Sequence, residues 1–196
     1  MDEKTVLKVY DLLDFTSMQP LPELITTKRL YLRRPGMADA ITIFERWGTD
    51  AEVAKYTSWR PHEKVDTLEC WLGEIIPAWL DGTCYTYAIC LRGDDRPIGM
   101  IEANPEQGFR VLMGYVLARA YWNQGFMTEA LQTFVDELFK QPTIHRVYAF
   151  CDIDNLASAA VMRKVGMQEE GILRKYFIHP NISEEPRDVL LLAKTR

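Results

Sequence analysis

The stretch Tyr121–Ala130, YWNQGFMTEA, joins two different sequence patterns. Before it, FRVLMGYVLA (109–118) is rich in apolar and β-branched residues, which is typical of a strand. After it, MTEALQTFVDELFK (127–140) places apolar residues at 127, 130, 131, 134, 135 and 138, the spacing of one helix face. Gly125 is the only glycine between the two patterns. The stretch therefore predicts a strand, a tight turn and a buried helix in succession.

Strand and helix signals alternate along the rest of the chain. Three strands in a row, joined by turns at Gly93–Asp95 and at Asn104-Pro105 and Gly108, predict an antiparallel meander, because short turns join antiparallel neighbours. The predicted order is β, αα, βββ, α, β, α, ββ, which indicates an α/β or α+β domain with a mixed sheet and helices on both faces. The strands are expected at 26–35, 83–92, 96–103, 109–118, 145–153, 167–179 and 187–194, and the helices at 36–50, about 51–56, 65–82, 127–140 and 155–166.

Residues 1–25 read as an N-terminal extension, because a weakly amphipathic run is broken by the prolines of MQPLPEL. Residues 26–196 are then a single domain, and the extension shows neither a signal peptide nor a membrane span. Cysteines at 70, 84, 90 and 151 form no C-x-x-C pair, and their apolar surroundings predict free, buried thiols. These features predict a cytoplasmic protein that does not act at a membrane.

The charge balance gives a net charge of −5, without the basic stripe of a nucleic-acid-binding protein. This charge mildly favours cationic substrates, although it is equally an ordinary contribution to solubility. No metal-ligand spacing is present in the sequence. We therefore expect no nucleic-acid partner and no metal.

The turn at Gly125 has the elements of an anion site. The first amides of a helix have no internal partners, and the helix dipole favours negative charge there. Gly125 permits close approach of a ligand, and the side chains of Asn123, Gln124 and Thr128 add donors, so the turn is suited to a pyrophosphate. Read alone, it is equally an ordinary helix start. It is neither a Walker A loop nor a Rossmann fingerprint, because the necessary lysine and further glycines are missing.

Several segments in the same order resemble the GNAT superfamily of N-acetyltransferases, and within it the RimJ/RimL-like branch. They are TKRLYLRRP near the start, IGMI and GYVLARAYWNQGFMTEAL in the middle, and HRVYAFCDIDNLASAAVMRKVGMQEEGILR near the end. The resemblance covers residues 26–196. It implies an acetyl-CoA co-substrate, and a sheet whose two central strands splay apart.

By this resemblance, the turn amides hold the CoA pyrophosphate and the strand Tyr115-Val116-Leu117 lies beside the pantetheine arm. The family motif falls on Trp122, Gly125 and Met127, where Met127 replaces a small residue and is expected to narrow the approach to the phosphates. Asn155 and Ser158 match the family's N-x-x-S, with the serine placed to protonate the CoA thiolate; both are also ordinary residues for the first turn of a helix. The implied CoA-binding residues are Val116, Leu117, Trp122, Asn123, Gln124, Gly125, Phe126, Met127, Thr128, Asn155 and Ser158.

The family reaction needs a neutral amine, and an alkyl amine is mostly protonated at pH 7, so a base assists. No carboxylate precedes Gly114 on its strand, where many members carry a glutamate. Glu102 on the preceding strand is the first candidate, with a solvent-facing charge as the other interpretation. Tyr115 and Tyr148 are weaker candidates. His62 and His179 are expected in loops and solvated, and His145 is expected to be structural.

The resemblance implies that the acceptor is a primary amine, either a protein N-terminus or a small molecule, and that it reacts by direct attack in a ternary complex. Aromatic residues are expected to line its site, namely Trp47, Tyr56, Trp59 and Tyr176. A non-catalytic acyl-CoA-binding module and a partner-binding domain remain alternatives. The chain is expected to be a monomer or a homodimer.

Overall fold

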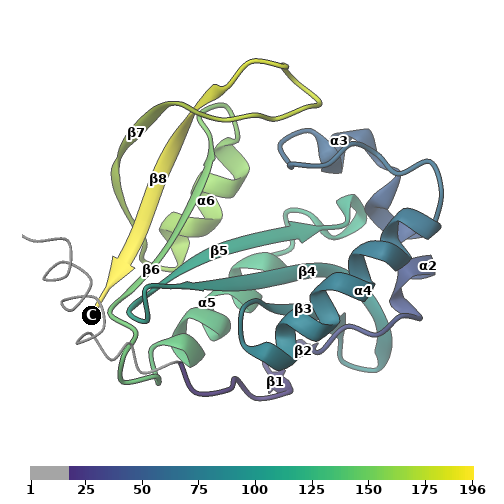
Figure 1. Cartoon of the computed structure of the whole chain (residues 1–196), viewed down its shortest axis with the longest axis horizontal. Coiled ribbons are helices and arrows are strands. Elements are labelled where there is room, and N and C mark those ends of the chain that lie inside the picture. Colours follow the sequence, from purple (N-terminus) through teal and green to yellow (C-terminus); the bar gives the residue numbers. More distant parts are fainter. Residues whose placement is uncertain (1–17) are drawn as a thin grey trace, which may run out of the picture.

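A computed structural model describes residues 18–196 as one mixed eight-stranded sheet with the strand order β1-β2-β3-β4-β5-β6-β8-β7 (Figure 1). All neighbouring strands are antiparallel except β5 and β6, which run parallel. This confirms the expected mixed, mostly antiparallel sheet. The strands are β1 (Leu24–Thr26), β2 (Leu30–Arg33), β3 (Tyr85–Leu91), β4 (Asp94–Glu106), β5 (Arg110–Leu117), β6 (Arg146–Asp152), β7 (Gln168–Phe177) and β8 (Arg187–Thr195).

The parallel pair is the place where the sheet opens. β5 and β6 pair only over Arg110–Leu112, opposite Arg146–Tyr148, and then diverge (Figure 1). Beyond Leu112, β5 pairs with β4 alone, so its other edge is left without a strand partner within residues 18–196. The expected splay of the two central strands is confirmed.

Helices cover both faces of the sheet (Figure 1). Helix α4 ends at Gly82, which has a left-handed conformation with φ 72°, and the Asn155 side chain caps the N-terminus of α6. The helical segments are α2 (Asp39–Ile43), the π-helical turn η1 (Phe44–Gly48), α3 (Ala51–Ala54), α4 (Asp66–Asp81), the 3-10 turn η2 (Arg119–Tyr121), α5 (Phe126–Leu138) and α6 (Leu156–Lys164).

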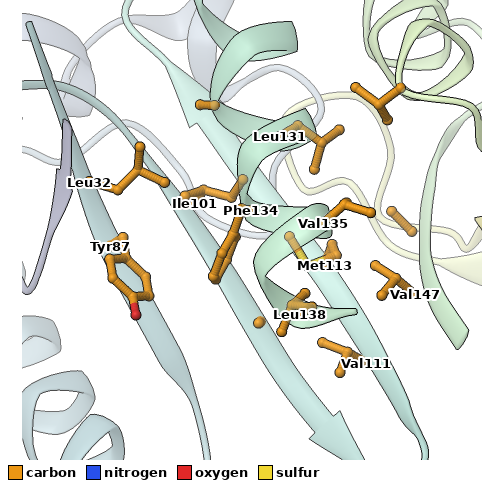
Figure 2. Packing of buried hydrophobic residues seen from close by; sticks show 14 of the residues in the cluster. Leu32, Tyr87, Ile101, Val111, Met113, Leu131, Phe134, Val135, Leu138 and Val147 are labelled. Carbon is orange, nitrogen blue, oxygen red and sulfur yellow. The ribbon is translucent and has the colours of Figure 1, made fainter. Parts of the chain in front are cut away.

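The main core lies between α5, α6 and the sheet. Figure 2 shows Leu131 and Phe134 of α5 facing side chains from several strands, among them Tyr87 and Ile101. Phe134 is fully buried and its ring meets that of Tyr87 at 5.1 Å, so truncation to alanine should cost about 3–5 kcal/mol. A second cluster on the other face joins α2, η1, α3 and α4 to Met100 of β4. The packing of the buried face of α5 against the sheet thus holds the first turn of this helix in a fixed position relative to β5.

Some local predictions were wrong. Asn104 and Pro105 do not turn; they pair with Leu112 and Val111, and the turn is the three-residue loop 107–109, which includes the predicted Gly108. Gln107 and Gly108 have positive φ, 51° and 72°. The single strand expected over 26–35 is two strands joined by a turn in which the Thr27 amide donates to the Leu30 carbonyl at 2.9 Å.

The expected boundary after residue 25 falls inside β1. Met18, Leu21 and Ile25 are buried in the main core, so the residues from 18 onward pack with the domain. Of the expected extension, residues 1–17 lie outside the described part of the chain. In the described part, no helix is long and apolar enough to cross a membrane.

Candidate active site

A cavity of about 480 Å³ lies where β5 and β6 diverge. Residues 112–116 of β5 and 149–151 of β6 line the cavity. Further lining residues come from the segment between η1 and α4. Its lining includes Ile43, Trp47, Gly48, Tyr56, Trp59, His62, Trp71, Met100, Glu102, Met113, Gly114, Tyr115, Val116, Phe150, Cys151, Asn155, Ser158, Phe177 and His179. None of the lining residues is a lysine or arginine, and Glu102 is the only carboxylate among them.

The turn before α5 is an open helix N-terminus. Gly125 is the N-cap residue with φ 76°, Asn123 has φ 59°, and no side chain caps the first amides of α5. Of these amides, Glu129 N–H donates to the Gly125 carbonyl at 3.0 Å. The earlier amides, those of Phe126, Met127 and Thr128, remain as donors in the described structure, as a helix start without a cap leaves them. This geometry suits a bound phosphate.

The side chains expected to assist at the turn are partly engaged elsewhere. The Trp122 indole donates to the Leu117 carbonyl at 2.7 Å, and the Gln124 amide donates to the Ala120 carbonyl at 2.9 Å. Met127 is 6% exposed and belongs to the main core, so its side chain does not narrow the approach to the amides as its size suggested. The turn therefore offers mainly backbone donors.

An ion pair not predicted from the sequence ties the turn to β2. Arg29 Nε lies 2.6 Å from Glu129 Oε2, and its Nη1 donates to the Gln124 carbonyl at 3.0 Å. The guanidinium also stacks on Phe126, 4.3 Å from the ring centroid. Hydrogen bonds from the Thr27 hydroxyl and the Arg29 amide and side chain lower the pKa of Glu129 against the opposing effect of its burial, so the pair stays charged. The pair is neutral overall, so Arg29 serves to hold the turn in place and the positive potential there comes from the helix amides.

Ser158 and Tyr115 meet across the open end of the sheet. Their hydroxyl oxygens are 2.7 Å apart, and the Tyr115 hydroxyl also donates to the Ser158 carbonyl at 3.1 Å. Burial raises the pKa of the Tyr115 phenol well above its usual range and that of the Cys151 thiol to about 11, so both stay protonated at neutral pH. Asn155 caps α6 by accepting from the Ser158 amide at 3.2 Å, and it also lines the cavity. The site thus holds paired hydroxyl groups in a protonated state.

Glu102 faces the cavity and not solvent. It pairs with Gly114 across β4 and β5, and a Cβ atom at Gly114 would stand 2.7 Å from Glu102 Oε1. The carboxylate thus occupies space that glycine leaves open. Burial raises its pKa, and the Asn104 amide, 3.4 Å from Oε1, opposes this only weakly. A carboxylate with a raised pKa is a better proton acceptor than an exposed one.

Three of the four aromatic residues expected at an acceptor site lie at the cavity: Trp47, Tyr56 and Trp59. Trp47 sits in the π-helical turn η1 and is 2% exposed. The fourth, Tyr176, lies outside the lining, because its position on β7 leaves it 53% exposed against Phe150.

The structure corrects the expectation that His179 is solvated. This residue follows β7, is 2% exposed and lines the cavity, and neither ring nitrogen has a hydrogen-bond partner among the described residues. Its loop position gave no sequence signal of burial. His62 also lines the cavity, stacked on Trp59, and burial lowers its pKa. The weaker base candidate Tyr148 lies outside the lining and donates to Glu106 at 2.6 Å.

Within residues 18–196, no group of three or more histidine, cysteine, aspartate or glutamate side chains is placed to hold a metal ion. All four cysteines are free, but only Cys90 and Cys151 are buried, because Cys70 lies on the exposed side of α4 and Cys84, just before β3, is half-buried. The prediction of four buried thiols was therefore half right.

Comparison with known proteins connects this geometry to a family. Residues 29–168 match the acetyltransferase (GNAT) domain. The N-acetyltransferase p20 of Bacillus licheniformis, itself uncharacterised, is 30% identical over 156 residues, which are 79% of this chain and 87% of p20. The crystal structure of a GNAT-family acetyltransferase from Bacillus anthracis is 26% identical, with a TM-score of 0.77 over 88% of this chain and 98% of that chain.

The fold is also that of Mycobacterium smegmatis RimJ, solved in complex with a CoA disulfide, with 23% identity and a TM-score of 0.77 over 88% of this chain and 86% of RimJ. The resemblance to the GNAT superfamily is confirmed, and RimJ shares its fold. The chain belongs to the GNAT family of acyl-CoA-dependent N-acetyltransferases.

Proposed function

We propose that this enzyme transfers an acetyl group from acetyl-CoA to a primary amine by direct attack in a ternary complex. The observation that carries the proposal is that one cavity contains both the open edge of β5 and the buried carboxylate of Glu102. A donor thioester and an acceptor nitrogen would therefore share one space, and no covalent acyl-enzyme is needed.

Acetyl-CoA fits the residues on the donor side. The first amides of α5 would hold the pyrophosphate, in a turn that Arg29 ties to β2 through the Gln124 carbonyl. The unpaired edge of β5, from Met113 to Val116, would hold the pantetheine arm, because free backbone groups in a sheet need a hydrogen-bonding partner. The thioester would then lie near Ser158 and Tyr115.

The proton transfers follow from these positions. The buried Glu102 carboxylate takes a proton from the acceptor ammonium, and the freed nitrogen lone pair forms the C–N bond. As the C–S bond breaks, the hydroxyl of Ser158 gives its proton to the thiolate and takes one from Tyr115, 2.7 Å away. Tyr115 then regains its proton from solvent, which receives the two protons that leave the nitrogen, so that one proton is released in each turnover. Burial raises the pKa of the Tyr115 phenol, so at neutral pH the Ser158 hydroxyl always faces a protonated partner.

The acceptor side favours a cationic amine on an apolar body. Aromatic side chains such as Trp47, Trp59 and Trp71 form its walls, and no lysine or arginine lines it to bind a carboxylate or phosphate. Both a small amine and the N-terminus of a peptide with apolar first residues meet these requirements. The free cysteines are compatible with the cytoplasm as the place of the reaction.

The test is binding followed by turnover. Saturating acetyl-CoA, at 100 times its dissociation constant, should stabilise the protein by about 2.7 kcal/mol in a thermal melt. An amine panel should then release free CoA thiol, and Ser158→Ala should lower kcat more than it weakens acetyl-CoA binding. Stabilisation without thiol release from any amine or peptide would instead favour a non-catalytic acyl-CoA-binding module. The absence of any stabilisation would contradict the proposal that this protein binds acetyl-CoA.

A further inference from the structure

His179 is a buried polar side chain that faces the cavity without a hydrogen-bond partner. It is 2% exposed, and neither Nδ1 nor Nε2 makes a hydrogen bond within residues 18–196. A buried imidazole left unpaired costs free energy unless a ligand or water completes it. The cavity is where such a ligand would lie.

A buried aspartate stands behind the ring. Asp152 Oδ2 lies 3.7 Å from His179 Nε2, and its side chain is fully buried. Although burial opposes it, hydrogen bonds from Arg187 at 2.5 and 3.1 Å lower the pKa of Asp152 and keep it ionised. An ionised carboxylate at this distance stabilises the imidazolium that forms when the ring accepts a proton.

The ring is also held in place. It packs edge-on against Tyr56 at 6.2 Å and tilted against Phe177 at 5.1 Å. Asn181, two residues on, donates to the carbonyls of Ala54 and Trp59 at 2.7 and 2.8 Å, which ties this loop across the cavity to the segment after α3. Figure 1 shows the β7–β8 loop and α3 facing each other above β5. His179 is thus part of the cavity roof.

The reaction requires more than one proton acceptor. An ammonium acceptor carries three protons and the amide product one, so two protons leave the nitrogen in each turnover. One proton ends on the CoA sulfur and the other in solvent, while the C–N bond forms and the C–S bond breaks. Glu102 accounts for only the first of the two proton transfers.

We propose that His179 is a catalytic residue that accepts the second proton, from the nitrogen of the tetrahedral intermediate. This rests on the proposed acetyl transfer and deepens it. Three charged side chains lie on the Asp152 side of the ring: Asp152 on β6, Asp154 in the following loop, and Arg187 on β8, which bridges the two aspartates. Glu102 lies on the cavity wall that β4 forms. Beside the ring, the two aspartates outnumber the one arginine that bridges them.

The test compares His179→Gln with His145→Gln, which alters an exposed histidine outside the cavity. With an amine that the wild type acetylates, His179→Gln should lower kcat about 100-fold and change KM for the amine less than threefold. His145→Gln should keep wild-type kinetics, and both variants should keep the acetyl-CoA-induced rise in Tm. Added imidazole should restore part of the turnover of His179→Ala.

Two results would overturn the proposal. One is a folded, acetyl-CoA-binding His179→Gln enzyme with kcat within threefold of wild type. The other is a double variant, Glu102→Gln with His179→Gln, whose kcat is no lower than that of Glu102→Gln alone. Failure of the wild type with every amine would refute the acetyl transfer instead, so the two failures are distinguishable.

Discussion

At the scale of single residues, Glu102 combines a functional position with a cost in stability. Its carboxylate is buried against the backbone of Gly114, and burial raises its pKa. Because its pKa is higher in the folded state than in the unfolded state, the protein is less stable to unfolding when Glu102 is ionised than when it is protonated. The stability that comes from protonation is fully present below the unfolded pKa, near pH 4.3, and is lost as the pH rises through the folded pKa.

We therefore expect Glu102→Gln to act in opposite directions on activity and stability. It should lower kcat by about 100-fold or more, because the proton acceptor is gone. It should raise Tm at pH 7 to 8, and this gain should vanish below about pH 4, where the wild-type carboxyl is protonated. Calorimetry across pH measures this difference. Glu106→Gln, on the same strand but outside the cavity, is the matched control; equal effects of both changes would contradict the assignment.

At the scale of elements, the turn before α5 and the helix itself have separate roles. The apolar face of α5, with Phe134 fully buried, anchors the helix, while its first amides stay open. A Cβ atom at Gly125 would meet only Arg29 Nη2, at 3.5 Å, so a substitution there acts through the positive φ and by covering the amides. A non-glycine residue in this conformation costs about 1–2 kcal/mol.

Gly125→Trp should consequently lose the stabilisation by acetyl-CoA while keeping the fold. We expect an intact circular dichroism spectrum, a Tm lowered by the cost of the strained φ, and little or no further shift with acetyl-CoA at a concentration that stabilises the wild type. Gly73→Trp, at an open position on α4, is the control that should still respond. A full response of Gly125→Trp would rule out this turn as the pyrophosphate site.

At the scale of the whole molecule, the two sides of the splayed sheet are joined in two places. At one end, β5 and β6 pair over Arg110–Leu112; at the other, the β7–β8 loop reaches the segment after α3 through Asn181. The cavity lies between these two connections. The roof contact is polar and partly exposed, so it is the weaker of the two.

Asn181→Ala should loosen this roof with little damage to the core. We expect a loss of about 1 kcal/mol in unfolding free energy, faster amide hydrogen exchange in the β7–β8 loop, and a higher KM for the amine. Gln132→Ala, which removes a side-chain hydrogen bond on α5 away from the cavity, is the comparison. Unchanged exchange in the loop would show that Asn181 does not hold the roof.

Periodicity alone determined the order of elements, the helix face of α5 and the glycine turn, because these depend on residues close together in the chain. The match of several segments to one family added the splayed strands and the role of the turn. Local patterns misplaced the hairpin turn at Asn104-Pro105, since pairing with β5 outweighed the turn preference of these residues. Glu102 was named from the sequence, but only its register opposite Gly114 established that it is half-buried and faces the cavity.

The tertiary structure alone decided which distant side chains share the cavity. His179 looked like a solvated loop residue until the β7–β8 loop was seen to close over β5, with Asp152 behind the ring. Tyr176, three residues earlier, points elsewhere because its place on the strand leaves it exposed. Burial and charge at a site arise from contacts between segments far apart in sequence, so the sequence fixes the candidates while the packing selects among them.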